Sequence, residues 1–197
     1  MIFQVSFFSR VANLVPCGDV NFEDIMSDIS SGRWKEEIQI CKNILRDEGK
    51  PKYKEYRSKN VPHFASHAVL NTRDRVVDSA RCKFWTGLLQ LDFDNLSGDD
   101  LSRVKSLSLK DPSVVSSYIS PSGSGVKIHL HVPQASDRDE FRVIVSSAER
   151  YCQDVYGVQP DLLTLRDMVR LCSVSFDPDL YYNKNSIPIS IDFRCFF

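Results

Sequence analysis

The sequence predicts an α+β fold, with a core over residues 87–197 and a mixed α and β portion over residues 1–86. Two patterns lead to this prediction. Apolar and polar residues alternate in the short segments 87–94 and 126–132, which is typical of strands. In the longer segment 136–156, apolar residues recur every three or four positions, which is typical of an amphipathic helix. We expect both portions to form one structural unit.

The N-terminal portion should contain helices between short strands. Caps and breakers mark its helices: Asn21 or Asp19 can begin the first, and Gly49 with Pro51 ends the second. The expected elements are a strand at 2–8, helices at 22–29 and 34–47, and strands near 61–69 and 75–80.

A basic stretch at residues 50–59 has two interpretations. Its lysines and arginine alternate with two tyrosines, so it could lie along a phosphate backbone. The same composition fits the solvated face of a helix. The residues concerned are Lys50, Lys52, Tyr53, Lys54, Tyr56, Arg57 and Lys59.

The core is expected to have the element order β-α-β-β-α-β, the split βαβ arrangement of ferredoxin-like domains. The first and third strands of such a sheet are central neighbours, and one sheet face carries no helix. The tail after Pro178 should be a turn, followed by an edge strand at 187–193. The six expected core elements are strands at 87–94, 114–120, 126–132 and 170–176, and helices from Ser97 or Asp99 to 110 and from Ser136 to 156.

The first core strand carries two carboxylates on one face. Leu89, Leu91 and Phe93 point to one side, whereas Asp92 and Asp94 point to the other. Two close negative charges repel unless a cation lies between them. Mg²⁺ and Mn²⁺ prefer such oxygen ligands. The alternative is a strand that ends in an acidic, solvated loop.

The third core strand carries a complementary set of side chains. Lys127, His129 and His131 alternate with apolar residues and should face Asp92 and Asp94 across the two central strands. The preceding turn lets backbone N–H groups approach a phosphate, although it could also be a simple hairpin. Its residues are Ser122, Gly123, Ser124 and Gly125.

Composition excludes few function classes. The formal net charge is −1, so any contact with nucleic acid must be local or supplied by another domain. No apolar run is long enough to span a membrane, and the first residues resemble a strand more than a signal peptide, so we expect a cytoplasmic protein. The six cysteines form no Cys-x-x-Cys pair and should be reduced thiols. His63 and His67 with Cys82 match no standard zinc spacing.

Three motifs resemble those of the archaeo-eukaryotic primase superfamily, the primases and primase-polymerases. They are Leu-Asp-Phe-Asp at 91–94, Ser-Gly-Ser-Gly-Val-Lys-Ile-His at 122–129, and Asp161 followed by Asp167-x-x-Arg170-Leu. More narrowly, the chain resembles the BT4734-like (VirE N-terminal) branch, found in bacteria, phages and mobile elements. The resemblance covers essentially the whole chain, including Val-Pro-His-Phe-Ala-Ser at 61–66.

The resemblance implies a nucleotidyltransferase on an RRM-like sheet that makes or extends primers on single-stranded DNA. Two Mg²⁺ or Mn²⁺ ions would be held by Asp92, Asp94 and Asp161, with Asp167 and Asp177 as lesser candidates for the third carboxylate. An NTP or dNTP would be bound by Ser122, Gly123, Gly125, Lys127, His129 and Arg170. Primase-like domains of this kind are often joined to a helicase, so the chain could be the N-terminal domain of a longer replication protein.

One position departs from the superfamily pattern. Lys127 stands where histidine is usual, and it can bind a triphosphate only as a point charge. Two alternatives therefore stay open. One is a catalytically silent nucleic-acid-binding or protein-binding module of the same fold. The other is an HUH-type replication endonuclease, in which His129 and His131 would bind metal and Tyr181 would attack DNA.

Overall fold

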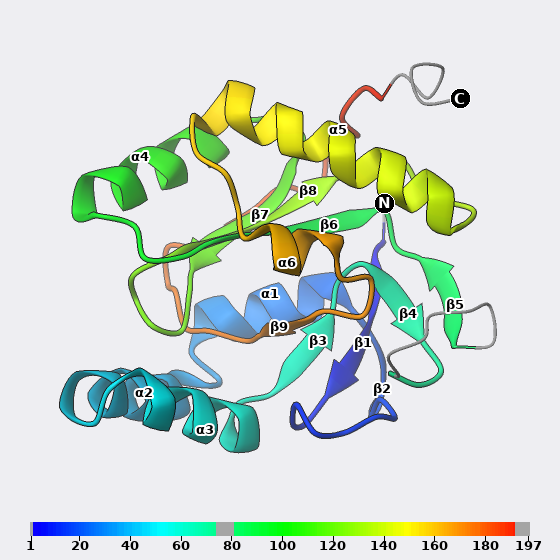
Figure 1. Cartoon of the computed structure of the whole chain (residues 1–197). Coiled ribbons are helices and arrows are strands. Elements are labelled where there is room, and N and C mark those ends of the chain that lie inside the picture. The colour runs from blue at the N-terminus through cyan, green and yellow to red at the C-terminus, as the bar shows by residue number, and fades with distance from the viewer. Residues whose placement is uncertain (1, 74–80, 192–197) are drawn as a thin grey trace.

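Antiparallel strands of the described residues, 2–73 and 81–191, form three sheets in this computed structural model (Figure 1). One sheet has the order β2-β1-β3-β9, another has the order β10-β7-β8-β6, and β4 pairs with β5. The strand bounds are β1 Gln4–Phe8, β2 Gly18–Asn21, β3 His63–Ala65, β4 Ala68–Leu70, β5 Cys82–Trp85, β6 Leu88–Phe93, β7 Val114–Ile119, β8 Val126–His131, β9 Leu171–Ser173 and β10 Tyr181–Tyr182.

Helices lie on both sides of these sheets, which confirms the α+β class. Figure 1 shows α4 and α5 over the sheet of β6, β7 and β8, with α2 and α3 at the opposite end of the molecule. The helix bounds are α1 Phe22–Ser31, α2 Lys35–Asp47, α3 Lys50–Asn60, α4 Gly98–Ser108, α5 Arg138–Tyr156 and α6 Leu162–Arg166. No helix in the described part of the chain has the length and apolar character to cross a membrane.

Local signals account for several helix ends. The chain leaves α1 at Gly32, where φ is 89°, and leaves α5 at Gly157, where φ is 65°, a conformation that glycine adopts without strain. Asp137, and not the expected Ser136, caps α5 by accepting hydrogen bonds from Asp139 N and Glu140 N. Ser136 instead donates its backbone N–H and its hydroxyl to the Glu140 carboxylate.

The first three predicted core strands pair as the sequence predicts. The first and third core strands, β6 and β8, are adjacent, and β7 lies on the other side of β8. Their register places Asp92 opposite Lys127 and Gln90 opposite His129. The polar faces of β6 and β8 therefore meet as expected.

The fourth strand does not join this sheet, which corrects the ferredoxin-like prediction. β9 pairs with β3 of the N-terminal sheet, and the edge beside β7 is taken by β10. No strand in the described part of the chain pairs with the outer edge of β6. Instead, its backbone forms hydrogen bonds with individual groups of other segments. Gln90 N donates to His67 Nε2 at 2.9 Å, and Asp92 O accepts from Asp161 N at 2.8 Å. These contacts use the backbone groups that a neighbouring strand would need.

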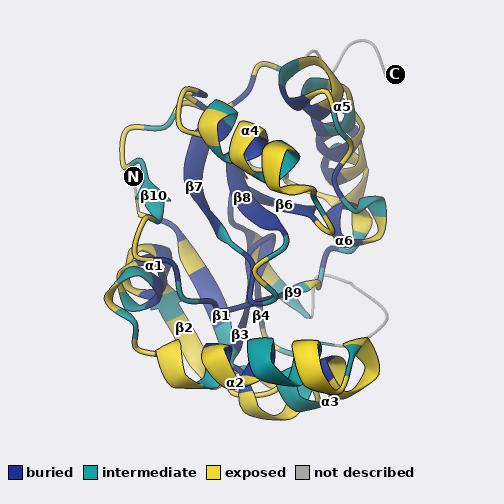
Figure 2. Cartoon of the chain, turned by 90° about the vertical axis from the view of Figure 1, so that its left-hand side faces the viewer, coloured by how far each residue is buried: buried dark blue, intermediate teal, exposed yellow. Residues whose placement is uncertain are grey.

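The sheet face expected to be open is covered, which is a second correction. All six residues of β6 are buried, not half of them. One face of the sheet packs through Leu89, Leu91 and Ile128 against α5. The other face packs through Leu88 and Tyr118 against α1, α2 and the N-terminal sheet. Figure 2 shows these strands in dark blue between helices with exposed outer sides.

Smaller differences concern the ends of the chain. Tyr181–Tyr182 is a short strand, although the sequence indicated a turn. β2 was not expected. The predicted strand at 75–80 lies outside the described residues, and residues 187–191 of the predicted 187–193 strand contain no strand. The described cysteines are all free thiols, as expected.

Candidate functional site

A buried ion pair forms the centre of the candidate site. Lys127 Nζ lies 2.6 Å from Asp92 Oδ2, and the two residues are 4% and 9% exposed. Burial by itself lowers the pKa of Lys127, but its neighbours, Asp92 foremost, together outweigh burial and hold that pKa above its usual value. Lys127 is therefore a fixed cation. The second oxygen, Asp92 Oδ1, is buried and has no hydrogen-bond partner.

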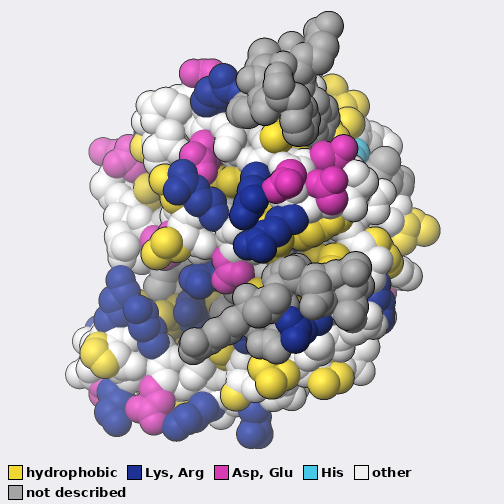
Figure 3. Space-filling view, turned by 45° about the vertical axis from the view of Figure 1, so that its right-hand side comes forward, with side chains coloured by type: hydrophobic (Ala, Val, Ile, Leu, Met, Phe, Trp, Pro, Cys, Tyr) yellow, Lys and Arg dark blue, Asp and Glu magenta, His cyan; other side chains and the backbone are white. Residues whose placement is uncertain are grey.

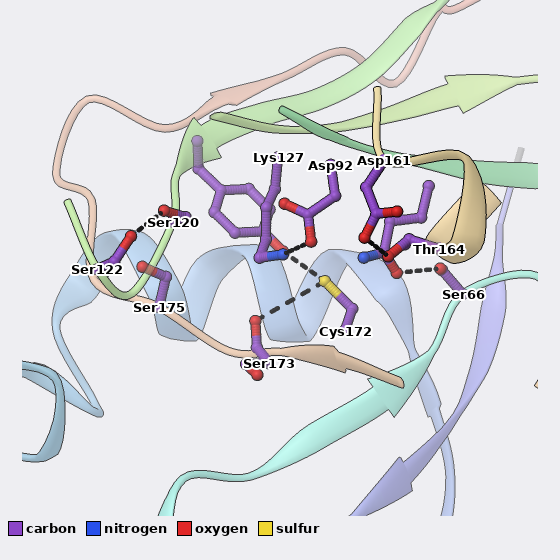
Figure 4. Close-up of polar contacts among 12 residues, drawn as sticks. Ser66, Asp92, Ser120, Ser122, Lys127, Asp161, Thr164, Cys172, Ser173 and Ser175 are labelled. Carbon is purple, nitrogen blue, oxygen red and sulfur yellow. Dashed lines mark hydrogen bonds and ion pairs between the residues drawn. The ribbon is translucent and has the colours of Figure 1, made fainter. Parts of the chain in front are cut away.

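Cys172 on β9 lies beside the ion pair (Figure 4), and the Tyr118 hydroxyl on β7 contacts its thiol. The side chains of Tyr118 on β7 and Cys172 on β9 lie 3.3 Å apart, OH to Sγ, and both residues are fully buried. Burial raises the pKa of the Cys172 thiol, so this cysteine stays protonated. These two uncharged groups lie next to the Asp92–Lys127 ion pair. The sequence patterns did not indicate either of them.

Asp94 lies beside the Ser-Gly-Ser-Gly turn. A β-carbon at Gly125 would be 2.5 Å from Phe93 O and 3.3 Å from Asp94 Oδ1, so only glycine permits this approach. Ser122 Oγ lies 3.0 Å from Ser120 Oγ and 3.1 Å from Ser124 Oγ. The turn therefore brings a row of hydroxyl groups to the end of β6, next to the carboxylates.

The Asp94 carboxylate is in an unfavourable environment for its charge. Although Asp94 is exposed at the protein surface, desolvation by its surroundings raises the pKa of its carboxyl, and the negative charges of Asp92 and Asp161 raise it further. Lys127 and Arg57 act in the opposite direction. All three acidic residues of the sequence prediction thus lie within electrostatic range of one another.

Asp161 approaches the site mainly through its backbone. Its N–H donates to Asp92 O, and its side chain caps α6. Leu163 N donates to Oδ1 at 2.9 Å, and Thr164 Oγ1 donates to Oδ2 at 2.9 Å. In residues 2–73 and 81–191, no group of three His, Cys, Asp or Glu side chains could hold a metal ion. This result also gives no support to zinc at His63, His67 and Cys82.

The lesser candidates for the third carboxylate lie elsewhere. Asp177 accepts from Lys105 Nζ at 2.7 Å and from Ile119 N at 2.8 Å, so it fixes the segment after β9. Asp167 follows α6 and accepts from Val169 N. Arg170 is exposed near Arg73 and His67.

His129 does not face a nucleotide, contrary to expectation. It is 0% exposed and packs against Phe22, Phe64 and Tyr118. Burial first, and the charge of Lys127 second, hold the pKa of His129 well below its usual value, so the ring is neutral. His131 is also buried, and its Nδ1 lies 3.0 Å from Ser186 O. The histidine pair of the HUH alternative is therefore enclosed.

Two cationic side chains, one from α2 and one from α3, lie close to the turn and to Asp94. A β-carbon at Gly123 would lie 3.5 Å from Lys42 Cε and 4.0 Å from Lys42 Nζ. Arg57 lies over the buried Tyr53 ring, at 5.3 Å from its centroid, within electrostatic range of Asp94. The basic 50–59 stretch had indicated Arg57, but nothing in the sequence pattern had indicated Lys42.

The available oxygen ligands suit a single divalent cation bound by two carboxylates better than a metal site formed by three carboxylates. Asp92 Oδ1 is an unpartnered buried oxygen, and Asp94 carries a charge that its surroundings disfavour. Mg²⁺ is commonly bound by one or two carboxylates together with substrate phosphates and water. The residues present therefore suit a cation that arrives with a phosphorylated ligand.

Comparison with known proteins assigns the family. The sequence-family model of the BT4734-like N-terminal domain matches residues 57–182. The chain belongs to this family. The matched part of the BT4734-like domain includes Arg57, Asp92, Lys127 and Asp161, whereas Lys42 precedes it. No curated protein and no solved structure matched the chain.

Proposed function

We propose that this BT4734-like domain is a primase-type nucleotidyltransferase that makes or extends primers on single-stranded DNA. The observation that carries the proposal is the meeting of Asp92, Asp94, Lys127 and the Ser122–Gly125 turn at one end of two paired strands. Cations beside an acidic pair suit a metal-bound triphosphate, in which both signs of charge must be matched.

Each residue then has a defined task. Asp92 Oδ1 and Asp94 would hold Mg²⁺ or Mn²⁺, and such an ion would supply charge neutralisation on the triphosphate and a lower pKa for an attacking 3′-hydroxyl. Lys42 and Arg57 would bind the outer phosphates of an NTP or dNTP, and the turn offers backbone N–H groups. Lys127 holds the Asp92 side chain in place through their ion pair. Asp161 positions α6 against β6 and would bind a second cation only if its capping bonds were released.

The wider assignment is part of the same proposal. The order of the three motifs supports membership of the archaeo-eukaryotic primase superfamily. We further propose, from that membership, a replication role in the cytoplasm of a cell or during propagation of a mobile element, and cooperation with a helicase domain or subunit. Lys127 in place of histidine is compatible with this role, because a buried, fixed cation still orients Asp92 through their ion pair.

The decisive variant is Asp94→Asn. It removes one metal ligand and leaves the buried Asp92–Lys127 pair intact, so the fold should be kept. We expect incorporation of labelled nucleotides on single-stranded template with Mn²⁺ to fall at least ~100-fold, since one lost preorganised charge partner costs a few kcal/mol. Asp99→Asn, a change of the same type in the first turn of α4, should retain wild-type activity.

A stability measurement accompanies the activity assay. Because desolvation raises the pKa of Asp94, its ionised form opposes folding at neutral pH, and Asp94→Asn should melt at the same temperature or higher without metal. Mn²⁺ should stabilise the wild type but not the variant. Normal incorporation by Asp94→Asn would refute the metal assignment.

One observation favours a second candidate, a catalytically silent binding module. Both Asp161 oxygens are hydrogen-bonded within α6, and Asp92 is neutralised by Lys127. Such a module would bind single-stranded DNA with equal affinity in wild type and Asp94→Asn, and neither protein would incorporate nucleotides.

A further inference from the structure

A pocket of about 240 Å³ lies between α5 and α6, and none of the carboxylates described above lines it. Its floor is apolar, formed by Phe141, Val145 and Met168. Three arginine side chains stand around this floor: Arg138, Arg142 and Arg166. The primase-type site does not use this combination of three guanidinium groups and an apolar base.

Two of these arginines are held in place by carboxylates. Arg166 binds Glu149 through two parallel bonds, at 2.7 Å and 2.9 Å, and Arg142 Nη1 lies 2.8 Å from Asp139 Oδ1. About 60% of each arginine side chain still reaches solvent: 61% for Arg142 and 59% for Arg166. The guanidinium groups are thus oriented but accessible. Figure 3 shows Lys and Arg side chains across the middle of one face of the molecule, with Asp and Glu side chains among them.

The chemistry of the pocket points to a ligand with alternating phosphates and flat apolar groups. A guanidinium group binds phosphate oxygens through its planar fork and also stacks on aromatic bases. An apolar floor accepts the face or edge of any base without reading its sequence. A net charge of −1 leaves no general attraction for a polyanion, so a local arginine cluster is the arrangement that such a ligand requires.

We propose that the pocket between α5 and α6 binds single-stranded nucleic acid. α6 connects this pocket to the candidate site, because Asp161 at its start contacts Asp92 and Arg166 is its last residue. Five helical residues span only about 7.5 Å. A strand held by Arg166 therefore lies within a few nucleotides of Asp92 and Asp94. Only this last point, that the bound strand is the template, rests on the proposed function.

The test compares two triple variants with the same change in net charge. The pocket variant is Arg138→Gln, Arg142→Gln and Arg166→Gln. The control is Arg10→Gln, Arg33→Gln and Arg46→Gln, in which two of the three arginines are likewise ion-paired, Arg33 to Asp28 and Arg46 to Asp47. Binding of a fluorescein-labelled oligothymidylate is followed by anisotropy in EDTA, and equal melting temperatures establish that both variants are folded.

We expect the pocket variant to bind at least tenfold more weakly than the control. Its slope of log affinity against log salt concentration should be smaller by roughly 2, since each lost phosphate contact on a single strand removes about 0.7. Ser146→Glu, at the exposed edge of the same pocket, should also weaken binding. EDTA removes any metal-dependent activity, so failure of the nucleotidyltransferase proposal would not alter these results.

Equal affinity and equal salt slopes for the two triple variants would overturn the proposal. It would also be overturned if polyglutamate bound as tightly as the oligonucleotide with the same loss in the pocket variant, because the surface would then select acidic polymers in general. In an active enzyme, the pocket variant should raise the KM for template and leave the KM for nucleotide unchanged.

Discussion

Replacing Lys127 by methionine should strongly destabilise the protein, because it leaves the Asp92 carboxylate buried without its cation. Removing one partner of a buried ion pair costs about 3–5 kcal/mol. Asp92 is 9% exposed, and its Oδ1 already has no hydrogen-bond partner, so little else can compensate. In a chain of this length about 1 kcal/mol corresponds to roughly 2–4 °C, so the melting temperature should fall by roughly 6–20 °C.

The double variant Asp92→Asn with Lys127→Met measures how strongly the two buried side chains are coupled. Replacing both charges removes the uncompensated ion, so the double variant should be more stable than Lys127→Met alone by about 2 kcal/mol or more. Urea unfolding followed by circular dichroism supplies all four free energies of unfolding. Additive losses would show that the two side chains are not coupled, and would refute the buried pair as the centre of the site.

The pH dependence of this pair has a definite sign. The pKa of Lys127 is raised above that of a free lysine, so the stabilisation is complete below the free-lysine pKa and is lost as the pH rises through the higher folded-state value. Wild-type stability should therefore fall steeply in strong base. The double variant, which lacks the pair, should show a smaller fall.

Two further predictions concern acid stability and chain packing. Burial lowers the pKa of His67 to about 4 and that of His63 to about 3. Their contribution to the free energy of unfolding is therefore complete above pH 6.5 and is lost in acid, where the unfolded chain takes up the protons first. At about pH 4, this effect at His67 alone lowers the free energy of unfolding by about 3 kcal/mol. Urea midpoints should fall between about pH 7 and pH 4, and less so in His67→Gln; an equal fall would contradict the burial of this ring. Gly125→Ala should cost several kcal/mol, because its β-carbon would lie 2.5 Å from Phe93 O, whereas Gly18→Ala, with open space around it, should be neutral in the same assay.

The local elements were predictable because their signals are local. Alternation of apolar residues identified β6 and β8, and apolar spacing with a terminal glycine identified α1 and α5. The pairing of β6 with β8 followed from the order of elements. Since antiparallel neighbours place facing residues at fixed positions, the meeting of Asp92 with Lys127 could be expected without a structure.

The candidate site was only partly predictable for a different reason. Asp161 N donates to Asp92 O, but the Asp161 side chain caps α6, and capping depends on where a five-residue helix begins. His129 was expected at an open surface because its strand alternates. Alternation shows which residues share a face of a sheet, but it contains no information on what covers that face.

By itself, the sequence determined the α+β class, the strands β6, β7 and β8 with the helices α4 and α5, and the facing of an acidic strand with a basic one, because periodicity and turn chemistry act over a few residues. Only the tertiary structure decided that β9 joins the N-terminal sheet, that His67 and Asp161 occupy the edge of β6, and that the polar sheet face is buried. These outcomes depend on which distant segments satisfy the remaining backbone groups and bury the second apolar face, and this competition is settled only when the whole chain packs.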